Sequence, residues 1–209
     1  MMEQGSPEWY AARLGKVGAS RVADIIAKTK SGWSASRANY MAELVAERLT
    51  GTPAEKFTSA AMQWGTDCEA EARAAYQFET GTVVAKVGFI PHPTIAMAGA
   101  SPDGVIGDAG LLECKCPNTA THIETLRGGS IPGKYVTQMQ WQLACTERQW
   151  CDFVSFDPRM PESMRLFIKR VERDNTYIGD LQAHVWLFLK ELDEAVADLR
   201  NRYETREAA

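Results

Sequence analysis

Two carboxylates and a lysine have the types and spacing that a metal-assisted hydrolytic site requires. Asp103 follows Pro102, and Glu113 comes after nine intervening residues. Because successive strand side chains alternate between faces, Glu113 and Lys115 should project to one side of a strand and Cys114 to the other. Carboxylates are the oxygen ligands that Mg²⁺ and Mn²⁺ prefer. Lysine cannot bind such a metal, but it can orient a water or stabilise charge that develops on a phosphate.

A tight turn is expected to bring these groups together. The glycine-rich residues 107–110 favour a turn between a strand at 105–106 and a strand at 111–116, which would place Asp103 near Glu113. The alternative is an exposed ion pair between Glu113 and Lys115. The neighbouring apolar residues indicate a largely buried strand, where an isolated carboxylate would be costly. The functional interpretation is therefore favoured.

The elements that must position these residues are predicted from capping residues and hydrophobic spacing. Helices are expected from Ser6 to Gly15, from Ser20 (as N-cap of a short helix), and over 36–49, 59–79, 118–126, 134–145 and 174–202. Strands are expected over 82–90, 95–100, 105–106, 111–116, 150–156 and 164–171. This order predicts an α/β (α+β) fold with a central mixed β-sheet flanked by helices. We expect one domain, 1–209, with a helical part 6–80, a sheet core 82–173 and a C-terminal helix 174–206.

Composition and charge narrow the classes of function. The chain has 209 residues, of which 45% are hydrophobic and 24% charged, with five cysteines and a net charge of −4. This is the mix of a globular domain with reduced thiols, expected in the cytoplasm and without a membrane span. Residues 11–50 hold seven basic and three acidic residues, whereas 51–110 hold three and seven. Such a division suits a metal-dependent enzyme that acts on a polyanion, although differently charged solvated helix faces would also explain it.

The sequence resembles a known nuclease family. Pro102-Asp103 with Glu113-Cys114-Lys115 resembles the PD-(D/E)xK signature, which implies a restriction-endonuclease-like core. The rest of the chain resembles the phage lambda exonuclease branch, the YqaJ-type viral recombinases. The likeness includes residues 9–15, 19–20, 64–69, 113–117, 138–140 and 157–160. It runs through nearly the whole chain in the right order, so it is more specific than any single motif.

The resemblance implies a role for each matching residue. Metal ligands would be Glu69, Asp103, Glu113 and the backbone carbonyl of Cys114, and catalytic groups would be Asp103, Glu113, Lys115 and Gln140, the last beside the scissile phosphate. A pocket for a DNA 5′-phosphate would contain Arg13 and Ser20, with a third contact from Lys28 or Lys30. Residue spacing alone places Glu69 on a solvated helix face. It also allows only one of Gln138 and Gln140 to face the site. Trp141 stands where related nucleases often carry tyrosine.

The implied activity is a Mg²⁺-dependent exonuclease, with Mn²⁺ as a substitute. It would degrade one strand of linear double-stranded DNA in the 5′→3′ direction to mononucleotides and leave a 3′ single-stranded tail. The family also implies a homotrimeric ring and a single-strand-annealing protein as partner. The alternatives are an endonuclease with the same metal core and a non-catalytic DNA-binding scaffold. A zinc site at Cys114, Cys116 and His122 is disfavoured because it lacks a fourth ligand.

Overall fold

The helices begin and end close to the predicted capping residues. The structure, a computed structural model, describes residues 2–54 and 59–204. The helices are α1 (Pro7–Arg13), α2 (Val22–Ile26), α3 (Ala35–Thr50), α4 (Ala60–Thr80), α5 (Thr119–Gly128), α6 (Gly133–Thr146) and α7 (Asn175–Tyr203), with the 3₁₀ turns η1 (Ala19–Arg21) and η2 (Glu162–Met164). Side chains at the N-caps of α1, α3, α4, α5 and α7 accept backbone N–H groups of the first turn. Residues 205 and 206, the expected end of the last helix, lie outside the described residues.

The main sheet is mixed, as predicted. Its strands are β6 (Gly104–Ile106), β7 (Gly110–Lys115), β8 (Trp150–Phe156) and β9 (Leu166–Glu172), in the order β6-β7-β8-β9. β7 and β8 are parallel, and the two outer pairs are antiparallel. β6 and β7 form the predicted hairpin, in which Gly104 pairs with Leu112. This register leaves Asp103 beside Glu113, at the end of the hairpin.

A smaller sheet joins the N-terminal part of the chain to the core. β1 (Val17–Gly18) pairs with β5 (Ala98–Ala100), which pairs with β4 (Ile90–Pro91), and β2 (Lys28–Thr29) forms a separate hairpin with β3 (Gly32–Trp33). The prediction of a strand over 82–90 is wrong for most of its length, because only Ala85 bridges to the short strand β6, at Val105. The chain passes close to β6 at this point, where a Cβ on Gly104 would lie 2.1 Å from Val84 Cγ1.

Helices cover both faces of the main sheet. One buried cluster joins Cys68, Ala72 and Tyr76 of α4 to the sheet, and another joins residues of α6, such as Met139, to the opposite face. Along β7, Leu112 packs in the α4 cluster and Leu111 in the α6 cluster, as side-chain alternation requires. Glu113 therefore faces α6. This arrangement decides which helix can reach the candidate catalytic carboxylate.

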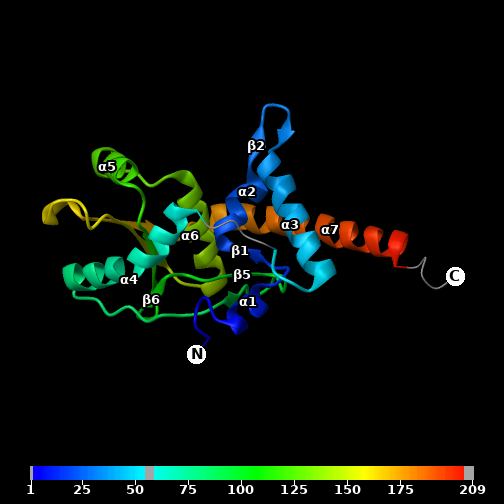
Figure 1. The fold of residues 1–209 in the computed structure, drawn as a ribbon, viewed down its shortest axis with the longest axis horizontal. Helices are drawn as coiled ribbons and strands as arrows, with labels where there is room; N and C mark the ends of the chain where they lie inside the picture. The colour runs from blue at the N-terminus through cyan, green and yellow to red at the C-terminus, as the bar shows by residue number, and fades with distance from the viewer. Residues whose placement is uncertain (1, 55–58, 205–209) are drawn as a thin grey trace.

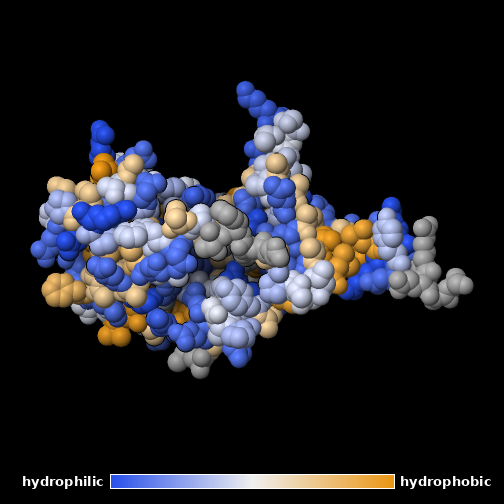
Figure 2. All heavy atoms as spheres, in the orientation of Figure 1, coloured by the Kyte–Doolittle hydropathy of each residue, from blue (hydrophilic) through white to orange (hydrophobic). Residues whose placement is uncertain are grey.

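A second, helical part of the molecule lies beside the sheet. α2, α3, α6 and α7 share a buried core that includes Tyr40, Trp141 and Phe188. The β2–β3 hairpin projects from the body of the molecule, and the C-terminal end of α7 extends away from that body in another direction (Figure 1). Apolar side chains such as Val45 and Leu199 line a groove where α7 runs past α3 (Figure 2). Among the described residues, the helices lack the combination of length and apolar character that a membrane crossing requires.

Candidate active site

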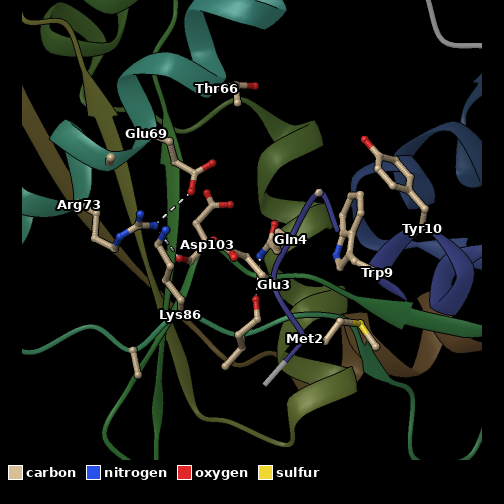
Figure 3. Close-up of a pocket in the computed structure, with 14 residues that line it drawn as sticks. Met2, Glu3, Gln4, Trp9, Tyr10, Thr66, Glu69, Arg73, Lys86 and Asp103 are labelled. Atoms are coloured by element: carbon tan, nitrogen blue, oxygen red, sulfur yellow. Dashed lines mark hydrogen bonds and ion pairs between the residues drawn. The ribbon is translucent and has the colours of Figure 1, made fainter. Parts of the chain in front are cut away.

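Asp103 lines a pocket of about 730 Å³ between the N-terminal segment, α1, α4 and the turn before β6, whereas Glu113 and Lys115 are not among the described residues that line it. We call it the Asp103 pocket, after the residue on that turn. Glu69 of α4 also lines it, and the Glu69 and Asp103 carboxylates approach one another from opposite walls (Figure 3). The Glu69 side chain keeps 35% of its surface exposed, as spacing alone leads one to expect, but this face of α4 lies toward the Asp103 turn.

Glu113 and Lys115 form an ion pair on one face of β7, which confirms the prediction from strand alternation. Glu113 Oε1 lies 2.5 Å from Lys115 Nζ, and the Glu113 side chain is only 1% exposed. Two amides complete its surroundings. Gln138 Nε2 donates to Oε1 and Gln142 Nε2 donates to Oε2, each at 2.6 Å. The buried carboxylate is thus held by three donors, as burial of a charge requires.

Asp103 is held against the same strand. Its Oδ2 accepts the backbone N–H of Cys114 at 2.7 Å, which confirms that the hairpin brings Asp103 to Glu113. Burial and the neighbouring charge of Glu113 raise the pKa of Asp103 well above its usual range. Burial alone would lower the pKa of Lys115, but attraction to Glu113 and Asp103 outweighs it and raises that pKa. Lys115 is therefore a stable cation beside carboxylates that repel one another.

A smaller pocket of about 170 Å³ adjoins the Asp103 pocket, with Gln4 and Trp9 lining both. We call it the Arg13 pocket; Arg13, Ser20 and Gln138 also line it. The Arg13 guanidinium lies over the Trp9 ring, 3.9 Å from its centroid. These residues come from α1, η1 and α6, so only the folded chain brings them together.

Comparison with known proteins identifies the family. Residues 8–149 match the YqaJ-like viral recombinase domain. The chain belongs to that family. Among solved structures, this YqaJ-like chain is similar to the alkaline exonuclease LHK-Exo of Laribacter hongkongensis, with 53% identity and a TM-score of 0.89 over 98% of this chain and 100% of that one. The same protein in complex with dAMP matches with a TM-score of 0.90, again with 53% identity over 98% and 100% of the two chains.

A more distant solved structure shares the fold. A phage-related exonuclease from Haemophilus somnus 129PT has 17% identity and a TM-score of 0.69, over 88% of this chain and 96% of that one. No curated protein matches significantly. The family and the α+β fold expected from the sequence are thereby confirmed.

The YqaJ-like chain does not bring Gln140 to the candidate catalytic residues. Gln140 Nε2 donates to the backbone oxygen of Glu172 at 2.7 Å, and its Oε1 accepts from Asp174 N at 2.9 Å. Gln138 faces Glu113 instead. Residues two apart on a helix point in nearly opposite directions, so the placement of Gln138 in the site excludes Gln140. Trp141 is also remote from these residues, because it is buried in the helical core and stacks on His92.

Three residues of the expected phosphate pocket lie differently from the prediction. Ser20 lies inside the 3₁₀ turn η1, and Arg21, not Ser20, occupies the N-cap of α2. The chain leaves β1 directly into this turn, which moves the start of α2 forward. Ser20 still lines the Arg13 pocket.

Lys28 and Lys30 lie on the exposed β2–β3 hairpin, where Lys28 Nζ is 4.7 Å from the Trp33 ring centroid. Within the described residues, neither lysine lines either pocket.

The donor set suits a hard divalent cation, but it does not form a closed cage. Asp103, Glu113 and Glu69 supply three carboxylates, and the cations Lys115, Arg73 and Lys86 lie near them. The oxygen donors are those that Mg²⁺ and Mn²⁺ prefer. Within 2–54 and 59–204, however, no three His, Cys, Asp or Glu residues are close enough to form a metal-binding group by themselves. A metal held here would need waters or substrate oxygens as further ligands.

Sequence reasoning missed several residues at these pockets. Gln4 Nε2 donates to the backbone oxygens of Val87 and Pro102, and Trp9 Nε1 donates to Ser101 Oγ at 2.9 Å. These contacts link positions more than 80 residues apart in the chain, so no local pattern indicates them. Gln142 was detectable in principle, because it shares a helix face with Gln138 one turn earlier.

Proposed function

We propose that this YqaJ-like protein is a Mg²⁺-dependent exonuclease, with Mn²⁺ able to substitute. It would degrade one strand of linear double-stranded DNA from the 5′ end, release mononucleotides and leave a 3′ single-stranded tail. The observation that carries the proposal is the Glu113–Lys115 ion pair beside Asp103, and Asp103 in turn lines the Asp103 pocket. Support comes from the 53% identity to an alkaline exonuclease whose structure has also been solved with dAMP, a mononucleotide.

The residues that would hold the metal are Asp103, Glu113, Glu69 and the backbone carbonyl of Cys114. A divalent cation bound there would polarise the phosphodiester and make the attacking water more acidic. Asp103 and Glu113 are fixed by hydrogen bonds from Cys114 N and from the amide of Gln138. Ligands fixed in this way need little rearrangement when substrate binds.

Lys115 would act on the phosphate as a cation. Its raised pKa keeps the ammonium protonated at neutral and moderately alkaline pH, so it is unsuited to remove a proton from water. It would instead donate to a phosphate oxygen or to the attacking water and stabilise the negative charge that grows in the transition state.

The Arg13 pocket would hold the 5′-terminal phosphate. Arg13 can bind two phosphate oxygens at once with its planar guanidinium. Ser20 and Gln138 line the same pocket and can donate further hydrogen bonds. Since Gln138 also contacts Glu113, it would connect the terminal phosphate to the catalytic residues.

A homotrimeric ring and a single-strand-annealing partner belong to the proposal through the family resemblance. The net charge of −4 is compatible with a ring, because only the inner surface would need to attract DNA.

Digestion of a 5′-phosphorylated linear duplex with and without Mg²⁺ tests the function. We expect mononucleotides and a shortened 5′-ended strand only when Mg²⁺ is present. A closed circle of the same sequence should remain intact, and its cleavage would favour the endonuclease alternative. Binding of the duplex without nucleotide release would favour the scaffold alternative.

A further inference from the structure

Arg73 lies between two of the candidate metal ligands. It stands one helical turn after Glu69 on α4, and its side chain is only 9% exposed. Arg73 Nη1 lies 3.1 Å from Glu69 Oε1 and 3.1 Å from the backbone oxygen of Asp103 (Figure 3). One guanidinium nitrogen therefore connects a helix carboxylate to the main chain of the turn that carries Asp103.

This arrangement differs from an ordinary i,i+4 ion pair on a helix surface. Such a pair stays solvated and contacts nothing beyond its own helix. Burial of a guanidinium is costly unless its donors are satisfied. Arg73 reaches across to a residue 30 positions away and borders the Asp103 pocket. Its contacts with Glu69 and with the Asp103 backbone offset the cost of burial, and they fix Glu69 relative to the Asp103 turn.

The contact also leaves room for a metal ligand. Arg73 contacts Oε1 of Glu69, which leaves Oε2 without a contact to Arg73, and in Figure 3 the Glu69 carboxylate lies beside the Asp103 carboxylate. Side chains that hold a metal ligand from behind set its orientation, and their loss typically weakens metal affinity or activity ~10–100-fold.

We propose that Arg73 is a positioning residue that orients Glu69 and ties α4 to the Asp103 turn, so that both carboxylates are ready to bind one divalent cation. The inference rests on the proposed metal-dependent function. Arg73 acts through Glu69 and Asp103. The planar guanidinium can serve two acceptors in fixed directions, whereas a lysine ammonium at the same position is a flexible point charge.

Metal binding without DNA provides the direct test. Mn²⁺ affinity is measured by electron paramagnetic resonance titration of the full chain, for wild type, Arg73→Gln and Arg73→Lys. We expect Arg73→Gln to weaken Mn²⁺ binding ~10–100-fold and Arg73→Lys to weaken it by a smaller factor. The Mg²⁺ concentration for half-maximal cleavage should rise more in Arg73→Gln than in Arg73→Lys. The cleavage rate at saturating Mg²⁺ should change by a smaller factor than this concentration does.

Arg170→Gln is the matched control. Arg170 also donates to a buried carboxylate, that of Asp152, at 2.8 and 2.9 Å. Asp152 in turn accepts from Tyr76 of α4, but neither Arg170 nor Asp152 lines the Asp103 pocket. Loss of this arginine removes an arginine–carboxylate ion pair next to the same helix. We expect Mn²⁺ affinity and Mg²⁺ dependence to stay at their wild-type values.

The outcomes separate this inference from the proposed function. Wild-type Mn²⁺ affinity in a folded Arg73→Gln variant, with its fold checked by circular dichroism and thermal unfolding, would overturn the role of Arg73. If Arg73→Gln does not fold, Arg73→Lys decides in the same way. An equal loss of affinity in Arg170→Gln would also overturn it, by indicating a general effect of destabilisation. Failure of the proposed function would show in the wild type, as cleavage that persists in excess chelator.

Discussion

Gln138 Nε2 on α6 donates a 2.6 Å hydrogen bond to Glu113 Oε1 on β7, the same oxygen that lies 2.5 Å from Lys115 Nζ. An amide and an ammonium thus share one oxygen of a buried carboxylate. Gln138 also lines the Arg13 pocket. The side chain therefore links the candidate catalytic residues to the candidate phosphate pocket.

The two glutamines of α6 should have separable roles. Gln138→Ala removes a donor to Glu113 and a wall of the Arg13 pocket, so we expect the initial rate of duplex digestion to fall about 10–100-fold. Gln140→Ala should keep the rate and cost about 1–2 kcal/mol of unfolding free energy, because it removes two hydrogen bonds to the β9–α7 connection. Initial rates and urea unfolding of both variants check this. A larger loss of rate in Gln140→Ala would restore the role implied by family resemblance.

Lys115 should matter for turnover more than for binding. Lys115→Ala removes the cation that would stabilise transition-state charge, and we expect the single-turnover rate to fall at least about 100- to 1,000-fold. Duplex affinity, measured by fluorescence anisotropy in chelator, should change little. If affinity decreases in step with the rate, Lys115 is a phosphate anchor.

Asp103→Asn should separate stability from activity. The pKa of Asp103 is raised by burial and by Glu113, so its ionised form destabilises the metal-free fold, and that destabilisation grows as pH rises through the raised pKa. The asparagine oxygen can still accept from Cys114 N. We therefore expect an unchanged or higher melting temperature without metal, together with loss of Mg²⁺-dependent cleavage. Retained cleavage by Asp103→Asn, or cleavage by the wild type in excess chelator, would contradict the metal-ligand assignment.

Ca²⁺ should bind to the wild-type protein without supporting turnover.

A 5′-phosphorylated duplex should be digested faster than a 5′-hydroxyl duplex. Arg13 offers two donors to the extra oxygens of a terminal phosphate, so Arg13→Ala should remove most of the difference. Lys28→Ala is the control, because Lys28 lies on the projecting hairpin and should leave the ratio of rates unchanged. Equal wild-type rates on the two substrates would show that the Arg13 pocket does not recognise a terminal phosphate.

Acid should destabilise the fold partly through Asp157. Burial alone would raise the pKa of Asp157, but hydrogen bonds from Arg159 and Thr119 lower it to about 2. Because the folded pKa lies below the usual value, this stabilisation is complete above about pH 5 and is lost as pH falls toward 2. We expect Asp157 to account for about 1 kcal/mol of lost unfolding free energy between pH 6 and pH 3. Urea unfolding of wild type and Asp157→Asn at both pH values measures it. An equal pH dependence in the two proteins would exclude this contribution.

Local physical chemistry made much of this protein predictable from its sequence. The helix starts at Ser6, Ser59 and Asp174 follow from side chains that accept N–H groups one turn ahead. Glu113 and Lys115 share a face because they lie two residues apart on a strand, and the glycine-rich turn brings Asp103 to them. The prediction of a strand over 82–90 is wrong for most of that segment. Strand propensity cannot reveal that the neighbouring strand β6 has only three residues and pairs with the segment at Ala85 alone.

The tertiary structure decided which helix faces reach the site. The sequence alone determined that either Gln138 or Gln140 could face it, and the packing of α6 on the Glu113 face of β7 selected Gln138. Spacing alone places Glu69 on a solvated helix face, and only the packing of α4 against the Asp103 turn brings it to the pocket, where Arg73 contacts both Glu69 and the Asp103 backbone. Helical periodicity fixes the relative directions of side chains on one helix, but the rotation of that helix against a sheet is set by burial of its apolar face. That burial depends on contacts between residues far apart in the chain.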